Sequence, residues 1–178
     1  MKDRILKWSR KEYTKRQRML ALIPQATLFV AIVPSIFWVF SYTIDDHFRL
    51  PKFVSPDFIA VFLILPGLLF AGWSVWAQFK IGKGTPAPMM PTQKLVVEGP
   101  YAYCRNPMIF GIMLFYLGIG VWMGSFSFIG LVILFVVSLL VYVKLVEEKE
   151  LEERFGQEYV EYKKRTPFLL PVPSKKHG

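Results

Sequence analysis

Four long runs of apolar residues constrain this chain more than any other feature of its sequence. None of the four contains Lys, Arg, Asp or Glu, and they cover residues 19–40, 58–79, 108–123 and 126–143. A run of about 20 apolar residues forms a helix long enough to cross the hydrocarbon core of a bilayer, about 30 Å thick. The third run, with 16 residues, is shorter than this. The pattern predicts an all-α integral membrane bundle of about four transmembrane helices.

Short intervals and prolines bear on how these helices are joined. Only Gly124 and Ser125 separate the third and fourth runs, which predicts a tight helical hairpin that packs as a unit. Pro24, Pro34 and Pro66 lie inside the first two runs, where each removes a backbone donor and favours a kink. Neighbouring helices can bond the carbonyl groups that a proline frees. If a proline divides the first run, the bundle has five transmembrane helices instead of four.

The charges outside the runs predict an orientation in the membrane. Segment 1–18 carries eight basic residues against two acidic ones, and the loop 80–107 carries four against one. The loop 41–57 has two basic and three acidic residues. Because basic residues are retained on the cytoplasmic side, both termini and the loop 80–107 are predicted to be cytoplasmic.

The chain is expected to form one membrane domain over residues 1–178. Segment 1–18 is expected to lie at the membrane surface as a basic amphipathic helix, and residues 19–79 to hold the first two spans. Residues 80–178 then contain the hairpin, a cytoplasmic C-terminal helix and most of the polar chemistry. The lipid bilayer is the expected partner, and no obligate protein partner is indicated.

Composition argues against several classes of site. One cysteine and two histidines, Cys104, His47 and His177, provide neither a metal-binding cluster nor an intramolecular disulfide. Much of the net charge of +9 lies beside the apolar runs, where basic residues set topology or contact anionic lipid. A nucleic-acid partner is not expected, because no recognition motif accompanies the charge.

Two polar segments depart from the apolar pattern and are candidates for function. Segment 82–111 has five prolines before Met108, which prevents a continuous helix and predicts a folded loop at the membrane surface. Segment 144–162 continues the fourth run out of the bilayer without a helix breaker before Gly156. Glu147 stands close to the membrane boundary, where a carboxylate is costly unless it has a partner. Its position favours a ligand or ion-pair role.

These segments resemble the isoprenylcysteine carboxyl methyltransferase family, in particular its prokaryotic, phospholipid-methyltransferase-like members. The two matching stretches read LVVEGPYAYCRNPMIFG over residues 95–111 and EEKELEERFGQEYVEYKKRTP over residues 147–167. In that family a G-x-Y-x-x-x-R-H-P-x-Y-x-G element precedes a helical hairpin, and E-E and FG-x-x-Y-x-x-Y follow it. The resemblance covers residues 86–171, which is about half of the chain.

The resemblance implies a membrane methyltransferase that binds S-adenosylmethionine from the cytoplasm and releases S-adenosylhomocysteine. Its acceptor is implied to be lipophilic and to arrive from the bilayer, as a prenylcysteine α-carboxylate would. Glu147 matches the family's acidic cofactor ligand. The other residues that the resemblance assigns to the cofactor are Gln93, Lys94, Leu95, Val96, Tyr101, Asn106, Pro107, Met108 and Ile109. No catalytic residue is assigned, because a carboxylate acceptor is already ionised at neutral pH.

Simple chemistry agrees with such a cofactor site. We expect Glu147 to bind the amino group or the ribose hydroxyls of the cofactor. Lys94 or Arg105 is expected to face its carboxylate, and Tyr101 with apolar neighbours to line its adenine. Alignment and the exclusion of water would then supply most of the catalysis.

Three positions depart from the family pattern. Asn106 stands where the family has His, and Ile109 where it has Tyr. Val143 stands where enzymes acting on prenylcysteine have Arg, four residues before the glutamate. Because of these departures, the resemblance supports S-adenosylmethionine as the cofactor more strongly than it supports prenylcysteine as the acceptor.

Two other functions compete with methyl transfer. A membrane sterol-type reductase has a similar C-terminal helical architecture but binds NADPH, whose extra phosphate calls for several cationic side chains. Here Lys83, Lys94 and Arg105 are few and scattered. A membrane scaffold without chemistry would bind neither cofactor.

Overall fold

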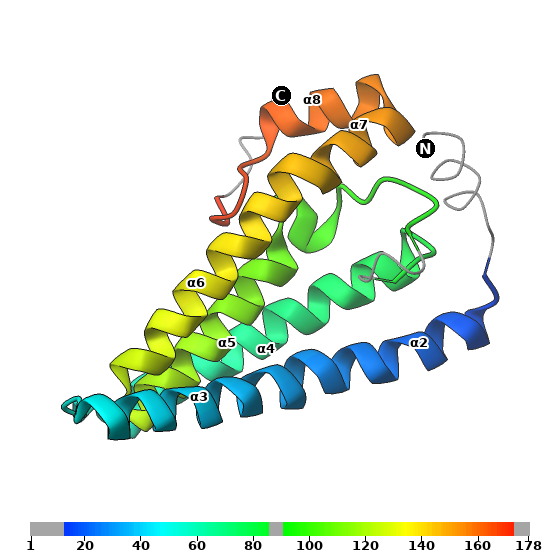
Figure 1. Cartoon of the computed structure of the whole chain (residues 1–178). Coiled ribbons are helices and arrows are strands. Elements are labelled where there is room, and N and C mark those ends of the chain that lie inside the picture. The colour runs from blue at the N-terminus through cyan, green and yellow to red at the C-terminus, as the bar shows by residue number, and fades with distance from the viewer. Residues whose placement is uncertain (1–12, 86–90, 173–178) are drawn as a thin grey trace.

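A computed structural model describes residues 13–85 and 91–172, and all regular elements within these ranges are helices. The long helices of the bundle are α2 (Lys15–Thr27), α3 (Val33–Phe48), α4 (Asp57–Lys80), α5 (Pro107–Met123) and α6 (Phe126–Tyr142). Two short helices, α7 (Glu148–Phe155) and α8 (Gln157–Arg165), cover one end of the bundle (Figure 1). The predicted interfacial segment 1–18 lies mostly outside the described residues.

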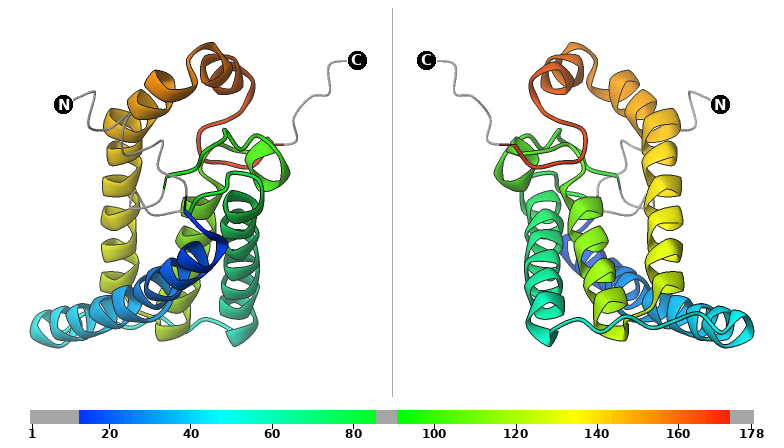
Figure 2. Two further views of the ribbon diagram at one scale, coloured as in Figure 1. Left: turned by 90° about the vertical axis from the view of Figure 1, so that its right-hand side faces the viewer. Right: turned by 90° about the vertical axis from the view of Figure 1, so that its left-hand side faces the viewer.

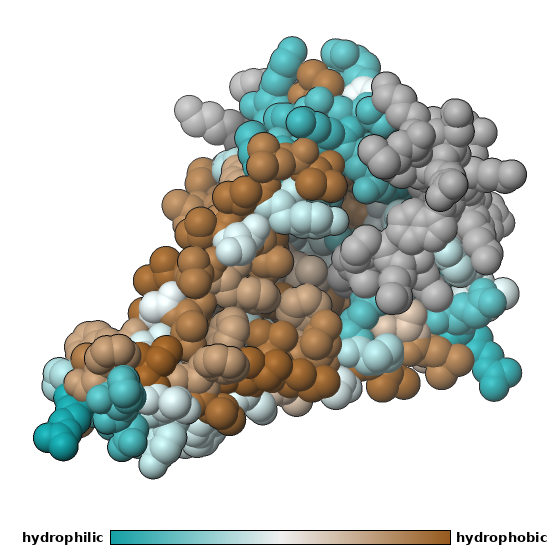
Figure 3. Space-filling view, viewed as in Figure 1, coloured by the Kyte–Doolittle hydropathy of each residue, from teal (hydrophilic) through white to brown (hydrophobic). Residues whose placement is uncertain are grey.

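The lengths of the helices confirm a membrane bundle. Among the described residues, three helical rods are long and apolar enough to cross a membrane, namely Lys15–Phe48, Asp57–Lys80 and Phe126–Phe155. α5 is equally apolar but has 17 residues, which give about 25 Å at the α-helical rise. The short third run therefore forms a helix that does not reach the full thickness of a hydrocarbon core. Apolar residues cover the body of the rods, and polar residues gather at their ends (Figure 3).

The first rod is continuous, so the five-helix alternative is not what the structure has. Pro24 lies inside α2, and Pro34 lies in the first turn of α3. A short π-helix, η1 (Leu28–Ile32), joins the two helices without interrupting the rod. Widened π-turns of this kind commonly accommodate a local break in the regular hydrogen-bond ladder.

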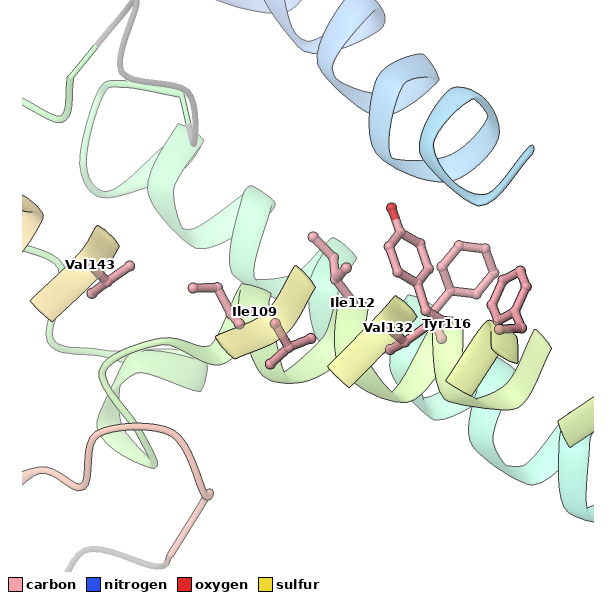
Figure 4. Close-up of a cluster of buried hydrophobic side chains, with 8 residues drawn as sticks. Ile109, Ile112, Tyr116, Val132 and Val143 are labelled. Atoms are coloured by element: carbon pink, nitrogen blue, oxygen red, sulfur yellow. The ribbon is translucent and has the colours of Figure 1, made fainter. Parts of the chain in front are cut away.

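A side chain from a neighbouring helix bonds a carbonyl group that the proline frees. Within η1 the Val33 N–H donates to Leu28 O. The next donor in this pattern would be residue 34, but Pro34 has no N–H, which leaves Phe29 O without a backbone partner in the rod. The Tyr116 hydroxyl of α5 donates to Phe29 O at 2.7 Å. In Figure 4 this hydroxyl points toward the first rod, as expected for a proline inside a membrane helix.

Glycines bring α4 and α5 into the closest helix–helix contact of the described structure. A Cβ added at Gly111 would lie 2.6 Å from Ala71 N and 2.7 Å from Gly67 O. One added at Gly118 would lie 2.9 Å from Ile64 N. Small residues at membrane interfaces allow such close approach and hence tight van der Waals packing. α5 therefore packs more closely against α4 than against α6, its neighbour in the hairpin.

The hairpin between α5 and α6 forms at the predicted residues. Gly124 has φ +62°, in the left-handed region that favours glycine, and its carbonyl accepts from Phe53 N at 3.1 Å. The Ser125 hydroxyl accepts from Phe128 N at 3.0 Å and donates to the Asp45 carboxylate at 2.7 Å. This end of the bundle is thus closed by contacts between α3, the loop before α4, and the hairpin.

A continuous row of buried apolar side chains joins α5 to α6. Ile109, Ile112 and Tyr116 of α5 pack with Val132 of α6 and Val143 at its end (Figure 4). Tyr116 and Val132 have no exposed surface. The row ends at Val143. Beyond it lies the polar cap, which α7 and α8 form together with the loop before α5.

The polar cap grows from the end of α6. A second π-helix, η3 (Val143–Glu147), carries α6 into α7, and Gly156 then turns the chain into α8 with φ +55°. α2 begins at this same end, because the Arg18 guanidinium donates to Phe79 O near the end of α4 at 2.8 Å. The start of the first rod, the loop after α4 and α8 therefore share one end of the bundle, as Figure 2 shows.

Substituting a contact glycine should loosen the α4–α5 pair. We expect Gly111→Ala to lower the free energy of unfolding by about 1–3 kcal/mol, because the added methyl group meets backbone atoms that cannot rotate away. Gly130→Ala on α6 is the matched control, since nothing lies within 4 Å of a Cβ there. Unfolding monitored by circular dichroism in detergent compares the two, and equal stabilities would show that the close contact is unimportant.

Candidate functional site

A cavity lies within the polar cap, where the ends of α4, η3, α7 and α8 meet the loop before α5. Its lining combines apolar, aromatic and polar side chains from segments far apart in sequence. The lining residues are Gln78, Thr92, Leu95, Val96, Tyr101, Arg105, Asn106, Val143, Glu147, Leu151, Tyr159 and Tyr162. Convergent polar groups in a largely apolar hollow are typical of a small-molecule site.

Tyr101 lines the cavity and bonds to two of the helices around it. It lies in the 3₁₀ turn η2 (Gly99–Ala102), and its hydroxyl accepts from the Gln78 amide of α4 at 2.5 Å. Its backbone carbonyl accepts from the Tyr162 hydroxyl of α8 at 2.7 Å. Burial raises the pKa values of both phenols, so both remain protonated near neutral pH.

Gln78 leaves one polar atom available toward a ligand. Its side-chain carbonyl is buried and has no hydrogen-bond partner among the described residues. Burying an unpaired amide oxygen is costly, so such an atom indicates a missing partner. Gln78 was not among the site residues predicted from the sequence. A polar amide near the end of an otherwise apolar run was the available signal.

Glu147 faces the cavity from η3. Val143, Glu147 and Leu151 recur at intervals of four residues, and all three line the cavity. This face places one carboxylate between two apolar side chains, in a lining that also contains the buried Tyr101. The predicted ligand role of Glu147 is compatible with this position.

The adjacent Glu148 points away from the cavity and holds the polar cap together. Its side chain is 3% exposed and forms an ion pair with Arg105 of the loop before α5. Lys144 and Lys163 lie 3.1 Å and 2.9 Å from its second oxygen. One buried carboxylate thereby links η3, the loop and α8, and removal of a partner from such a buried pair is strongly destabilising.

This arrangement changes the expected role of Arg105. Arg105 was predicted as a partner for the carboxylate of a cofactor, whereas its guanidinium forms an ion pair with Glu148. Arg105 still lines the cavity, and its Nε is buried without a hydrogen-bond partner among the described residues. Arg105 is therefore not a free cation for the carboxylate of a cofactor, although its Nε donor is unpaired.

The predicted cofactor residues fall into two groups. Those in the cavity lining are Leu95, Val96, Tyr101, Asn106 and Glu147. Asn106 is also committed elsewhere, because its side-chain amide donates to Phe168 O at 2.8 Å. The residues outside the lining are Gln93, Lys94, Pro107, Met108 and Ile109.

The residues outside the lining hold the loop in place or pack in the apolar core. The backbone N–H groups of Gln93 and Lys94 both point to Gly82 O, at 2.6 Å and 3.4 Å. Ile109 belongs to the buried row between α5 and α6, and Met108 packs against that row. Sequence proximity to the loop did not distinguish these supporting residues from the lining, because side-chain direction depends on the folded path of the loop.

Contacts across the loop close the site on the side of α7. The Arg154 guanidinium donates to Thr92 O of the loop and lies 3.3 Å from Glu150. Tyr159 and Tyr162 of α8 are each 2% exposed and complete the wall. The contact of Arg154 with Thr92 was not predicted, because it joins residues 62 positions apart.

The part of the chain that carries the site is similar to a known protein family. A model of the phospholipid methyltransferase family, PEMT, matches residues 57–158, which is more than half of the chain. The matched region contains α4, the loop, the hairpin and most of the cap. No significant match is found among curated protein sequences.

Cys104 provides a pH-dependent reporter of the cap. The thiol is fully buried, and burial raises its pKa to about 11. Because the thiolate is the reactive form, we expect alkylation by N-ethylmaleimide at pH 8 to be about a hundredfold slower than in the unfolded chain. The rate should climb as the pH approaches 11. Mass spectrometry of the modified protein measures it, and equally fast labelling of the folded chain at pH 8 would contradict the buried position.

Proposed function

Because the chain belongs to the phospholipid methyltransferase family, we propose that it transfers a methyl group from S-adenosylmethionine to a lipophilic acceptor such as a prenylcysteine α-carboxylate. Methyl transfer in a membrane is what the family implies. The cofactor and the acceptor are the further parts of the proposal. The cavity of the polar cap is the proposed cofactor site.

The observation that carries this proposal is a carboxylate and an unpartnered amide oxygen in one cavity with apolar walls. Glu147 offers a negative charge for the amino group of the cofactor, and the Gln78 carbonyl is a buried acceptor for a hydroxyl or amino group. Leu95 and Val96 provide an apolar surface for an aromatic base, with Tyr101 beside them. This donor and acceptor set fits a molecule with cationic, hydroxyl and aromatic parts.

In this reaction the residues of the chain bind the cofactor and orient it. When bound, S-adenosylmethionine supplies a methyl group that its sulfonium centre activates. Glu147 and Gln78 would fix the cofactor, and Tyr159 and Tyr162 would exclude water from it. An ionised carboxylate acceptor requires no proton removal, so we assign no general base.

The same cavity is a poorer match for NADPH, the cofactor of the sterol-type reductase alternative. A nucleotide phosphate calls for several cations. Among the described lining residues, Arg105 is the only cation, and Glu148 already pairs with it. Lys94, the other candidate, does not line the cavity.

Calorimetry with the purified chain in detergent tests the cofactor directly. We expect S-adenosylhomocysteine and S-adenosylmethionine to bind and NADPH not to bind. Binding of NADPH alone would favour the reductase, and binding of neither would favour a scaffold. Transfer of labelled methyl groups to a prenylcysteine analogue or to phospholipid then identifies the acceptor.

Glu147→Gln tests the proposed cofactor ligand. We expect a loss of affinity for S-adenosylhomocysteine of about tenfold to a hundredfold, because a hydrogen bond to a charged group contributes about 1.5–3 kcal/mol. The substitution keeps the shape of the side chain, so the helical circular dichroism should not change. Glu158→Gln, at an exposed position of α8, is the matched control. Equal affinities in the two variants would show that Glu147 is not a ligand.

We also propose that the polar cap faces the cytoplasm. The start of the first rod, the loop after α4 and α8 lie at one end of the bundle, and this end gathers the basic segments. Retention of basic residues on the cytoplasmic side favours that orientation. The cofactor would then be reached from the cytoplasm and the acceptor from the bilayer.

A further inference from the structure

The segment after α8 returns to the site as an extended strap, defined here as residues 166–172. It crosses from α8 to the loop before α5, as both views of Figure 2 show. Pro167 O accepts from Arg105 N at 2.8 Å, Phe168 O accepts from the Asn106 amide at 2.8 Å, and Val172 N donates to Tyr103 O at 3.1 Å.

The strap suits a position at the edge of a bilayer. Two of its residues, Pro167 and Pro171, have no N–H group that would need a partner. Leu170 and Val172 are large apolar residues whose exposed fractions are 64% and 50%. An irregular segment with few free donors and exposed aliphatic side chains is compatible with contact to lipid chains.

Phe168 occupies the seam between the beginning of α5 and η3. It packs against the buried row that contains Ile109 and Val143. Its ring centroid lies 5.2 Å from the Arg105 guanidinium carbon and 5.4 Å from Lys144 Nζ. Phe168 therefore touches both sides of the seam and is held by two cations.

The wall behind Phe168 is also the wall of the cavity. Arg105 and Asn106 line the cavity and contact Phe168. Val143, a third lining residue, belongs to the buried row against which Phe168 packs. Phe168 of the strap thus lies directly behind residues that line the proposed cofactor site. Asn106, where the family pattern has His, serves to fasten this strap.

We propose that this seam is the access route of the lipophilic acceptor, whose apolar chain takes the place of the Phe168 ring between α5 and η3. This inference rests on the proposed function. Lys144 pairs with Glu148, but its side chain is 55% exposed and its ammonium group has three donors, so it can also bind an anionic group of the acceptor beside the seam. The shared chemistry is a long apolar chain with an anion near its polar end, and both a prenylcysteine carboxylate and a phospholipid meet it.

Photo-crosslinking in proteoliposomes tests the route. Two probes carry a diazirine on the apolar chain, one an S-prenylcysteine with a free carboxylate and the other a diacyl phospholipid. For the probe that resembles the true acceptor, we expect labelled peptides to concentrate at Ile109, Val143 and Phe168. Labelling spread evenly over the lipid-facing helices with both probes would overturn the proposal.

Substitutions of the strap make the test specific. Phe168→Ala should increase labelling at Ile109 and Val143 several-fold, because the ring no longer competes with the probe. Leu170→Ala is the matched control on the exposed side of the strap and should leave the labelling unchanged. Phe168→Leu is the substitute if Phe168→Ala does not fold. It keeps a smaller apolar side chain in the seam, so labelling at Ile109 and Val143 should increase less than is expected for Phe168→Ala. Equal labelling in the folded Phe168 variants and the control would refute the role of Phe168.

Binding of S-adenosylhomocysteine separates this inference from the function on which it rests. We expect the folded Phe168 variants to keep the affinity of the unchanged chain, since the ring lies outside the cavity lining. If S-adenosylhomocysteine fails to bind the unchanged chain, the proposed function fails whatever the labelling shows. If it binds and the seam is not labelled, only the access route is wrong.

Discussion

The close contact of α4 with α5 is the constraint on which the rest of the bundle depends. α5 has 17 residues and does not reach across a hydrocarbon core, so it needs support from a longer neighbour. Gly67, Gly111 and Gly118 give it that support by letting the two backbones meet. The contact also brings the end of α4 beside the loop before α5, where Gln78 meets Tyr101. Packing in the apolar body thereby builds the first wall of the polar cavity.

A second constraint, the ion pair of Glu148 with Arg105, joins the other wall to the first. Glu148 belongs to the helix that continues α6, and Arg105 belongs to the loop before α5. Adjacent residues of a helix point about 100° apart, so the two neighbouring glutamates have different surroundings. Glu148 is buried among cations, and Glu147 faces the cavity. A structural carboxylate thus holds its neighbour in the position proposed for a ligand.

The strap adds a third layer to this design. Its backbone is bonded to the residues that precede α5, and Phe168 lies in the seam between the beginning of α5 and η3. The π-turn η3 lies on the other side of the same seam. Such turns are frequent at functional sites, because they change the direction of side chains without ending the helix. In the proposed function, the cofactor occupies the cavity and the acceptor enters through the seam beside it.

The sequence by itself determined the membrane character, the helical hairpin at Gly124 and Ser125, and the family. These depend on local properties, namely the length of apolar runs, turn residues and two linear motifs. Through the family resemblance it also pointed to Leu95, Val96, Tyr101, Asn106 and Glu147 as parts of one site, and all five line one cavity.

Only the tertiary structure decided which residues complete that cavity and which merely support it. Gln78 and Tyr162 join the lining from segments outside the loop, whereas Lys94 and Ile109 do not face it. The pairing of Arg105 with Glu148 and the return of Phe168 to the seam were equally beyond prediction. Each depends on contacts between residues that are 40 or more positions apart. Local periodicity gives the direction of a side chain on its own helix, but packing alone decides what that side chain meets.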